Sequence, residues 1–382
     1  MKKTLYIIVL TLCFVLALIG KSYGRDIKID WQNCFENAFL SNYSDFNTGS
    51  IVQTFDGGYI FIGSRNSSLW LVKLNNQNNI QWEKTINDPN IGKSIIREKY
   101  VPNSGGQRAE GLIKIDKNGN IIWKSDFIPS FVIGGFISNL TELYNGDVLY
   151  TSYGSNLDST KLFKFDINGT RKFVKSYGQN HKITSIIPLS NNSYCTLFDT
   201  CNAQHCFIGF NKYNGFDQLI LQKSIKIDSI IRVFNGTIVR NNINSFYILS
   251  RKIENQTDLT RVLFKIDSLG NTIWMKDLND SKTTNTEYLF ISKNDSSIII
   301  PKFFRTNITI EVYDKYGNFI FKDSIVESYF YHFVTTISQC KDGGFILSRT
   351  INQLNGDVEC YQGPSDNIWL AKFFFNPNYI TG

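Results

Sequence analysis

The chain is poor in histidine, with only His181, His205 and His332 among 382 residues. They lie far apart, and none stands in a metal-ligand pattern such as His-Glu-x-x-His. No Gly-x-Ser-x-Gly sequence occurs, so a serine nucleophile has no motif either. We identify no catalytic residue, no cofactor-binding residue and no metal ligand, and we expect a protein that binds rather than catalyses.

Helical patterning is also lacking. No window shows sustained 3.6-residue periodicity of apolar residues, and alanine is rare. Tyr, Phe, Ile, Val and Thr are abundant, and Asn, Ser, Asp and Gly interrupt them at short intervals, which is typical of short strands joined by turns. The composition predicts an all-β fold with almost no helix.

Positive charge is not clustered. The formal net charge of +7 becomes +4 when residues 1–24 are removed, because Lys2, Lys3 and Lys21 are lost with them. The remaining Lys and Arg residues are scattered, whereas a nucleic-acid site needs a basic patch or stripe. We therefore expect no nucleic-acid partner.

Residues 1–24 have the pattern of a signal peptide. Two lysines precede an apolar run at residues 5–19, and Ser22 and Gly24 are small residues at the −3 and −1 positions of a cut after Gly24. A membrane anchor is the first alternative, although the run is short for one. A lipoprotein signal built on Cys13 is the second. No later run approaches transmembrane length, so we expect a secreted, periplasmic or cell-envelope protein.

A four-strand unit recurs along the mature chain, residues 25–382. In residues 50–86 it reads SIVQT, an Asp-Gly-Gly turn, YIFIG, LWLVKL, an Asn-rich turn and IQWEKTI. Its second half recurs as GLIKIDKNGNIIW at 111–123, where Asn118-Gly119 is a strong hairpin signal. Further copies lie at 161–176, 206–224, 262–277 and 308–323. Each unit is predicted to be a four-stranded antiparallel meander.

A large apolar residue opens the final strand of each unit. These residues are Trp82, Trp123, Phe173, about Leu221, Trp274 and Phe321, with successive spacings of 41, 50, 48, 53 and 47 residues. A period near 50 with four strands is typical of β-propeller blades, since one such sheet cannot bury both faces alone.

The two chain ends supply complementary parts of one unit. The last unit has only three strands, ending at residues 367–375, and residues 27–35 match a fourth strand. Trp31 lies 51 residues, one period, before Trp82. The sequence therefore predicts a single-domain, seven-bladed β-propeller whose ring is closed by the N-terminal strand joining the last blade, which removes two exposed sheet edges.

Blade two is the irregular one. Residues 93–110 must supply its first two strands, and Pro102 with Gly105-Gly106 interrupts any clean alternation. Six full blades plus an irregular insert is therefore the alternative.

The phrasing SIVQT-x-DGGYI-x-x-GS, followed by WLVKL and NIQW, resembles the tandem blades of secreted Bacteroidota propeller proteins with PQQ-like or delta-60-like repeats. The resemblance covers nearly the whole mature chain and is sharpest in residues 50–86, 111–125, 262–277 and 335–372. It implies an exported, mostly uncharacterised class whose members often end in a type IX secretion sorting domain. Because this chain ends at Gly382 directly after its last blade strand, we expect no such domain here.

Export would place six mature cysteines where disulfides persist. We predict a Cys34–Cys360 bridge, because the loop between the second and third strands of a blade emerges on the same side as the end of its fourth strand. We also predict a Cys201–Cys206 bridge within a hairpin loop. His205 lies between these last two cysteines, so metal binding is the alternative there.

Two repeated features invite a functional interpretation. Asp116, Asn118 and Asn120 alternate like the start of a calcium loop, but Ile121 and Phe127 occupy the positions that need Gly and Glu. We expect these Asp and Asn residues to form turn hydrogen bonds instead. The tryptophans would suit a quinone or sugar platform, but because they recur once per blade we expect them to pack between blades.

The sequence thus favours an exported, non-catalytic binding or scaffold module, monomeric and without a cofactor, that contacts a protein or glycan at the cell envelope. Its contact face is expected at the long second-to-third loops, notably 352–366 and 199–205, and at the loops joining blades. The alternative is a periplasmic propeller enzyme, quinoprotein-like or carbohydrate-active, with its site at the central channel. A cluster of carboxylates or histidines at the channel mouth would favour the enzyme.

Overall fold

Strands and tight turns make up the part of the chain that the computed structural model describes. That part comprises residues 27–35, 51–65, 68–86, 100–104, 109–125, 128–129, 136–153, 160–178, 181–201, 206–225, 232–241, 245–254, 258–278, 288–304, 307–326, 335–351 and 367–375. Every regular element in these ranges is a β-strand, as the composition predicted. No helix long and apolar enough to cross a membrane lies within them.

Five sheets are antiparallel meanders of four consecutive strands. The first holds β2 (Ile51–Gln53), β3 (Tyr59–Arg65), β4 (Ser68–Leu74) and β5 (Ile80–Ile86). The next two hold β10 (Phe136–Glu142), β11 (Val148–Tyr153), β12 (Thr160–Phe165) and β13 (Arg171–Ser176), then β14 (His181–Pro188), β15 (Tyr194–Cys201), β16 (Cys206–Tyr213) and β17 (Leu219–Ile225). The last two hold β18 (Arg232–Arg240), β19 (Phe246–Glu254), β20 (Asp258–Ile266) and β21 (Thr272–Leu278), then β22 (Phe290–Ile291), β23 (Ser297–Phe303), β24 (Asn307–Asp314) and β25 (Phe319–Val326).

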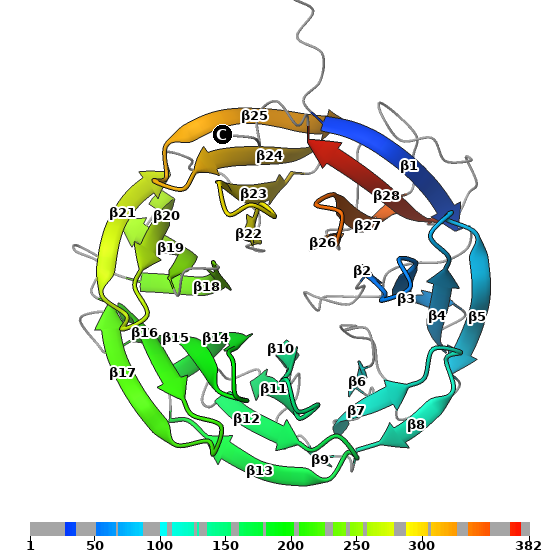
Figure 1. Ribbon diagram of the computed structural model, residues 1–382, viewed down its shortest axis with the longest axis horizontal. Coiled ribbons are helices and arrows are strands. Elements are labelled where there is room, and N and C mark those ends of the chain that lie inside the picture. The colour runs from blue at the N-terminus through cyan, green and yellow to red at the C-terminus, as the bar shows by residue number, and fades with distance from the viewer. Residues whose placement is uncertain are drawn as a thin grey trace, which may run out of the picture.

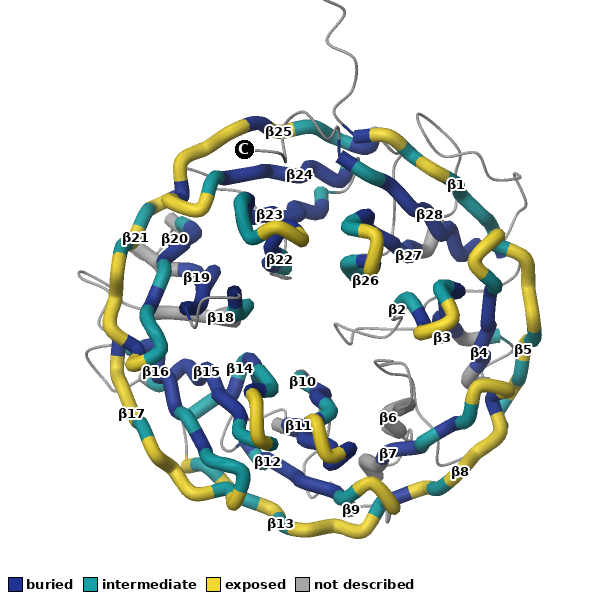
Figure 2. The backbone as a smooth tube through the Cα atoms, viewed as in Figure 1, coloured by how far each residue is buried: buried dark blue, intermediate teal, exposed yellow. Residues whose placement is uncertain are grey.

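The sheets stand side by side around a common axis, with the first strand of each innermost and the fourth outermost (Figure 1). Burial differs between the strands of a sheet, and the outermost strands are the most exposed (Figure 2). Third strands such as β24 are buried along almost their whole length, because a sheet on either side covers them. Fourth strands such as β13 alternate between exposed and half-buried residues. Third strands thus bury polar as well as apolar side chains, whereas fourth strands leave every second side chain exposed.

A sixth four-stranded sheet joins the two ends of the chain. It holds β26 (Thr335–Gln339), β27 (Phe345–Ile351), β28 (Asn367–Phe375) and, as its outer strand, β1 (Ile27–Phe35). The register places Ile27 opposite Phe375 and Cys34 opposite Trp369, with one irregularity between Ile29 and Trp31. The predicted pairing of the N-terminal strand with the last blade is confirmed.

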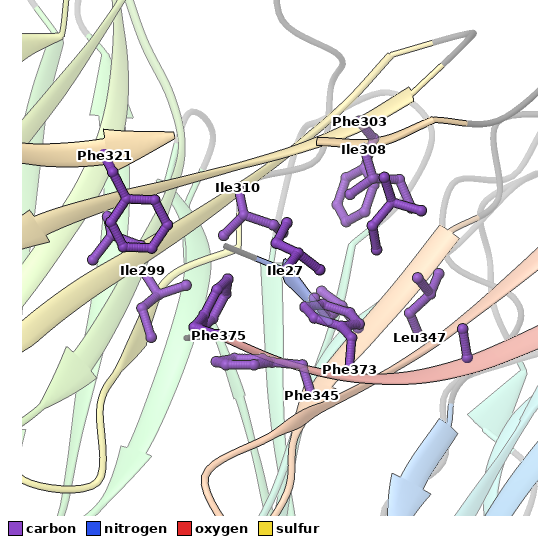
Figure 3. Packing of buried hydrophobic residues seen from close by; sticks show 14 of the residues in the cluster. Ile27, Ile299, Phe303, Ile308, Ile310, Phe321, Phe345, Leu347, Phe373 and Phe375 are labelled. Atoms are coloured by element: carbon purple, nitrogen blue, oxygen red, sulfur yellow. The ribbon is translucent and has the colours of Figure 1, made fainter. Parts of the chain in front are cut away.

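The β1 strand packs against both neighbouring sheets. Ile27, near its start, lies in a cluster with Phe345 and Phe373 of its own sheet and Phe321 of β25 (Figure 3). Phe35, at its end, contacts Phe61 and Trp70 of the first sheet, with ring centroids 4.8 and 5.7 Å away. Each such buried side chain contributes about 1.5–3 kcal/mol to folding.

The predicted count of seven regular four-stranded blades is wrong in one sheet: six are regular, and residues 100–129 form a different arrangement. This sheet holds β6 (Tyr100–Ser104), β7 (Ala109–Ile115), β8 (Ile121–Lys124) and β9 (Ile128–Pro129). Both β8 and β9 pair with β7, so its outer strand is divided in two. Residues 93–110 supply one strand before β7 among the described residues, not two. The alternative of six full blades plus an irregular unit is the one observed.

Two residues distinguish this sheet from the regular ones. Pro102 lacks a backbone N–H and lies in β6, an edge strand of the sheet, where a missing donor is tolerated. Ser125, directly after β8, donates its N–H to Leu112 O and accepts the Leu112 N–H with its hydroxyl, each at 2.8 Å. The side chain thus takes the place of a backbone acceptor, and regular pairing along β7 resumes only at Ile128.

Candidate functional site

Tight turns gather on one face of the structure. In a four-stranded antiparallel meander, the turn between the first and second strands and the turn between the third and fourth leave the sheet on the same side. We call the side that bears them the tight-turn face. It comprises residues 54–58, 75–79, 116–120, 143–147, 166–170, 189–193, 214–218, 267–271, 292–297, 314–318 and 340–344.

The Asp residues that head the third-to-fourth turns are occupied by their own turns. Asp116 Oδ1 accepts the N–H groups of Asn118 and Asn120, each at 2.8 Å, and Oδ2 accepts Asn120 Nδ2 at 2.9 Å. The Asn120 hydrogen bonds lead the interactions that hold the pKa of Asp116 below its usual value. Asp267 and Asp314 repeat the same pattern. The predicted turn role of these residues is confirmed.

Tryptophans of the fourth strands lie against the turn of the following sheet. Trp82 Nε1 donates to Lys117 O at 3.0 Å, and Trp123 Nε1 donates to Ile167 O at 2.9 Å. A Cβ on Gly119 would lie 2.7 Å from the Trp82 ring. A Cβ on Gly169 would lie 2.7 Å from the Trp123 ring, and one on Gly317 would lie 2.8 Å from the Trp274 ring. These contacts confirm that the repeated tryptophans pack between blades.

Buried lysines of the third strands bind Asp residues of the first turns, a feature the sequence analysis missed. Lys73 Nζ lies 3.0 Å from Asp56, and Lys164 Nζ lies 3.4 Å from Asp147. Lys372 repeats the arrangement with Asp342. Burial raises the pKa of Asp56, but hydrogen bonds from Thr54, Lys73 and Gly58 outweigh it and hold the pKa at about 2. The signal was present in the sequence, since the first two pairs share a separation of 17 residues.

Large aromatic side chains project from the tight-turn face. Phe55, Tyr144, Phe216 and Tyr316 are 75%, 75%, 86% and 59% exposed, and each lies within a turn closed by backbone hydrogen bonds. Lys341 of the neighbouring sheet lies 4.1 Å from the centroid of the Phe55 ring. Rigid, exposed aromatic residues are the side chains that most often anchor a binding partner, because little conformational freedom is lost on contact. These residues were not predicted from the sequence, where the contact face was expected at the long second-to-third loops.

The loops predicted to form the contact face lie mostly outside the described residues. This holds for 352–366 and for 202–205, whereas Asp199 and Cys201 belong to β15. The proposed role of these loops stays a prediction.

The innermost strands brace neighbouring sheets with polar side chains. Thr141 Oγ1 donates to Ile186 O at 3.1 Å, and Ser338 Oγ donates to Ile51 O at 2.6 Å. The described ranges contain no group of three or more His, Cys, Asp or Glu residues able to hold a metal ion.

Only His181 of the three histidines lies within the described residues. Its ring stacks between Phe198, with centroids 3.9 Å apart, and Tyr177, with centroids 5.1 Å apart. Burial lowers the pKa of His181, so the neutral form is favoured. This environment is that of a packed aromatic side chain between two sheets.

The cysteines divide into two groups. Cys195 and Cys340 are free and buried, and burial raises the pKa of each thiol to about 12. Cys34 is held in a disulfide, while its predicted partner Cys360 lies outside the described residues, so that pairing stays a prediction.

The other predicted bridge is compatible with the observed register. Cys201 and Cys206 are opposite each other where β15 ends and β16 begins. Opposed residues in antiparallel strands have Cα atoms about 4.5–5.5 Å apart, a separation that a disulfide can span. The Cys201–Cys206 bridge itself also stays a prediction.

No family model and no curated protein matches this chain. Among solved structures, it is similar to the WD40 domain of Toxoplasma gondii coronin, with a TM-score of 0.51 and 7% identity over 91% of this chain and 87% of that one. A protein of unknown function from Bacteroides caccae matches at a TM-score of 0.39 and 12% identity, over 70% of this chain and 93% of that one. A quinonprotein alcohol dehydrogenase-like protein from Bacteroides thetaiotaomicron matches at a TM-score of 0.45 and 14% identity, over 75% of this chain and 67% of that one. At these identities the similarity concerns the fold alone, and the chain has a β-propeller fold of small four-stranded antiparallel blades.

Proposed function

We propose that this chain is an exported, non-catalytic β-propeller module that binds a protein or glycan partner at the cell envelope. In this proposal β1 closes the ring by completing the last blade. Removal of residues 1–24 is part of the proposal, and N-terminal sequencing of the exported protein should begin at Arg25.

The observation that carries the proposal is the set of aromatic residues on the tight-turn face. Phe55, Tyr144, Phe216 and Tyr316 are held on short turns, so binding orders few additional groups and retains more of the contact energy. The carboxylates of the same turns are occupied by hydrogen bonds from their own turns or by lysines, as at Asp116 and Asp147. The aromatic rings are therefore the groups on this face best suited to make new contacts.

The test is retention of a partner by the mature chain, residues 25–382. The immobilised chain is exposed to envelope extract and to a panel of glycans, alongside a variant carrying Tyr144→Ala and Phe216→Ala. A matched control carries Ile122→Ala and Ile273→Ala, which truncate side chains on outer strands that are 56% and 55% exposed.

We expect the partner to be retained by the wild type and by the control, and its affinity to fall at least about tenfold in the aromatic variant, since anchor residues contribute more than about 1 kcal/mol each. Equal retention by all three chains would contradict the proposed contact face. Shortening or chemical conversion of a glycan would favour the enzyme instead.

A further inference from the structure

Two buried polar atoms lie unpaired on one face of the β14–β17 sheet. Thr196 Oγ1 and Asn211 Oδ1 make no hydrogen bond with any described residue, although their residues are only 1% and 4% exposed. His181 Nε2, on the same face, is also buried without such a bond. Buried polar atoms almost always have a partner, either protein or ordered water.

The register places Thr196 and Asn211 side by side. They are opposite each other in the β15–β16 pair. Tyr194 and Phe198, two residues to either side of Thr196, belong to the cluster shared with the β10–β13 sheet. Cys195 and Leu197 point into the cluster on the other face. Because side chains alternate along a strand, Thr196 and Asn211 both face the β10–β13 sheet.

The hydrogen bonds around Asn211 define which atoms remain open. Asn211 Nδ2 donates to the Tyr213 hydroxyl at 3.4 Å, and that hydroxyl lies 3.1 Å from the Tyr177 hydroxyl. Asn211 Oδ1 is therefore an open acceptor, and the Thr196 hydroxyl beside it is an open donor and acceptor.

Charges in the same interface restrict what can fill this position. Lys164 Nζ lies 2.9 Å from Asp217 and 3.4 Å from Asp147. The ammonium group disfavours a second cation, while the two carboxylates and the Asn211 acceptor disfavour an anion. A small neutral molecule that both donates and accepts hydrogen bonds suits the open atoms best.

We propose that an ordered water molecule, buried between the β10–β13 and β14–β17 sheets, bridges Thr196 Oγ1 and Asn211 Oδ1. It supplies the hydrogen bonds that these atoms lack, and it makes this interface between blades hydrated at its centre. The inference is independent of the proposed function.

The direction in which Thr196→Val changes the stability of the protein tests the proposal. Thr196→Val keeps the shape of the side chain and removes the hydroxyl. With a bridging water, the substitution leaves that water and Asn211 short of a hydrogen bond, and the unfolding equilibrium shifts about three- to tenfold toward the unfolded chain. With a dry interface, the substitution removes an unpaired polar group, and stability stays unchanged or rises.

Thr141→Val is the matched control, because Thr141 is equally buried and has a protein partner in the same interface, Ile186 O. Thr141→Val should destabilise the protein whether the interface is hydrated or dry, and it measures the cost of losing one buried hydrogen bond. A Thr196→Val variant as stable as the wild type or more stable overturns the proposal. If that variant does not fold, electron density of the wild-type chain decides: a peak within about 3 Å of both atoms supports the water, and its absence overturns it.

Discussion

Substitution of Gly119 by alanine should destabilise the protein far more than the same change at Gly343. Both glycines have positive φ, 76° and 91°, and both lie on the tight-turn face. An alanine in the left-handed region costs about 1–2 kcal/mol at either position. The surroundings differ, because nothing lies within 4 Å of a Cβ at Gly343, whereas a Cβ at Gly119 would meet the Trp82 ring at 2.7 Å.

The magnitude of the difference follows from the displacement of Trp82. Ordinary carbon contacts begin near about 3.5 Å, so the ring must retreat by about 0.8 Å. That movement strains the 3.0 Å hydrogen bond from Trp82 Nε1 to Lys117 O, which contributes about 1 kcal/mol. Overpacking adds about 1–3 kcal/mol. We expect Gly119→Ala to lower the free energy of unfolding by about 3–5 kcal/mol, and Gly343→Ala by about 1–2 kcal/mol.

Urea denaturation followed by circular dichroism measures both values. Repeating Gly119→Ala in a Trp82→Ala background should reduce its cost to that of Gly343→Ala, because the two effects act through one contact. Equal costs at Gly119 and Gly343 in the wild-type background would refute the reasoning that Trp82 joins one blade to the next.

Two further predictions concern titration and oxidation. Burial lowers the folded-state pKa of His181, so the unfolded chain takes up the proton first and stability is lost as the pH falls below about 6.5. His181→Phe should weaken this loss of stability between pH 7.5 and 5.5. Identical pH profiles of unfolding free energy for the two chains would count against a buried neutral histidine. Peptide mapping of the unreduced protein should yield linked peptides for Cys34–Cys360 and Cys201–Cys206, while Cys195 reacts with an alkylating reagent only after unfolding; any other partner for Cys34 would contradict the topological argument for its bridge.

The parts of the fold that repeat were predictable from the sequence. Trp82, Trp123 and Trp274 recur at one position of the unit, so a single physical role for all three could be inferred, and the contacts with Gly119 and its counterparts agree with it. The pairing of the chain ends was predictable for the same reason, since Trp31 lies one period before Trp82.

Features that occur once, or that depend on two distant segments, were not predictable in this way. The divided outer strand beside β7 arises from the Ser125 hydroxyl taking the place of a backbone acceptor, and no periodic pattern reports that exchange. The unpaired atoms of Thr196 and Asn211 depend on which face of the hairpin meets the β10–β13 sheet. The lysine–aspartate pairs lie between these cases, because the common spacing of Lys73 from Asp56 and of Lys164 from Asp147 is visible once the turns are placed.

The candidate contact face was the least predictable element. Phe55, Tyr144, Phe216 and Tyr316 occupy turn positions where polar residues are more common, and each alone could be an isolated exposed side chain. Only the meander topology, which sends both kinds of turn to one side, places the four on the same face.

The central claim is that the two ends of the chain share one sheet and so join the first and last blades. A crystal structure of the mature chain tests it most directly. We expect β1 to lie antiparallel to β28 with Cys34 opposite Trp369, Ile27 packed against Phe373 and Phe35 packed against Phe61. A structure in which residues 27–35 pair with another strand, or leave the outer edge of β28 open, would contradict the account.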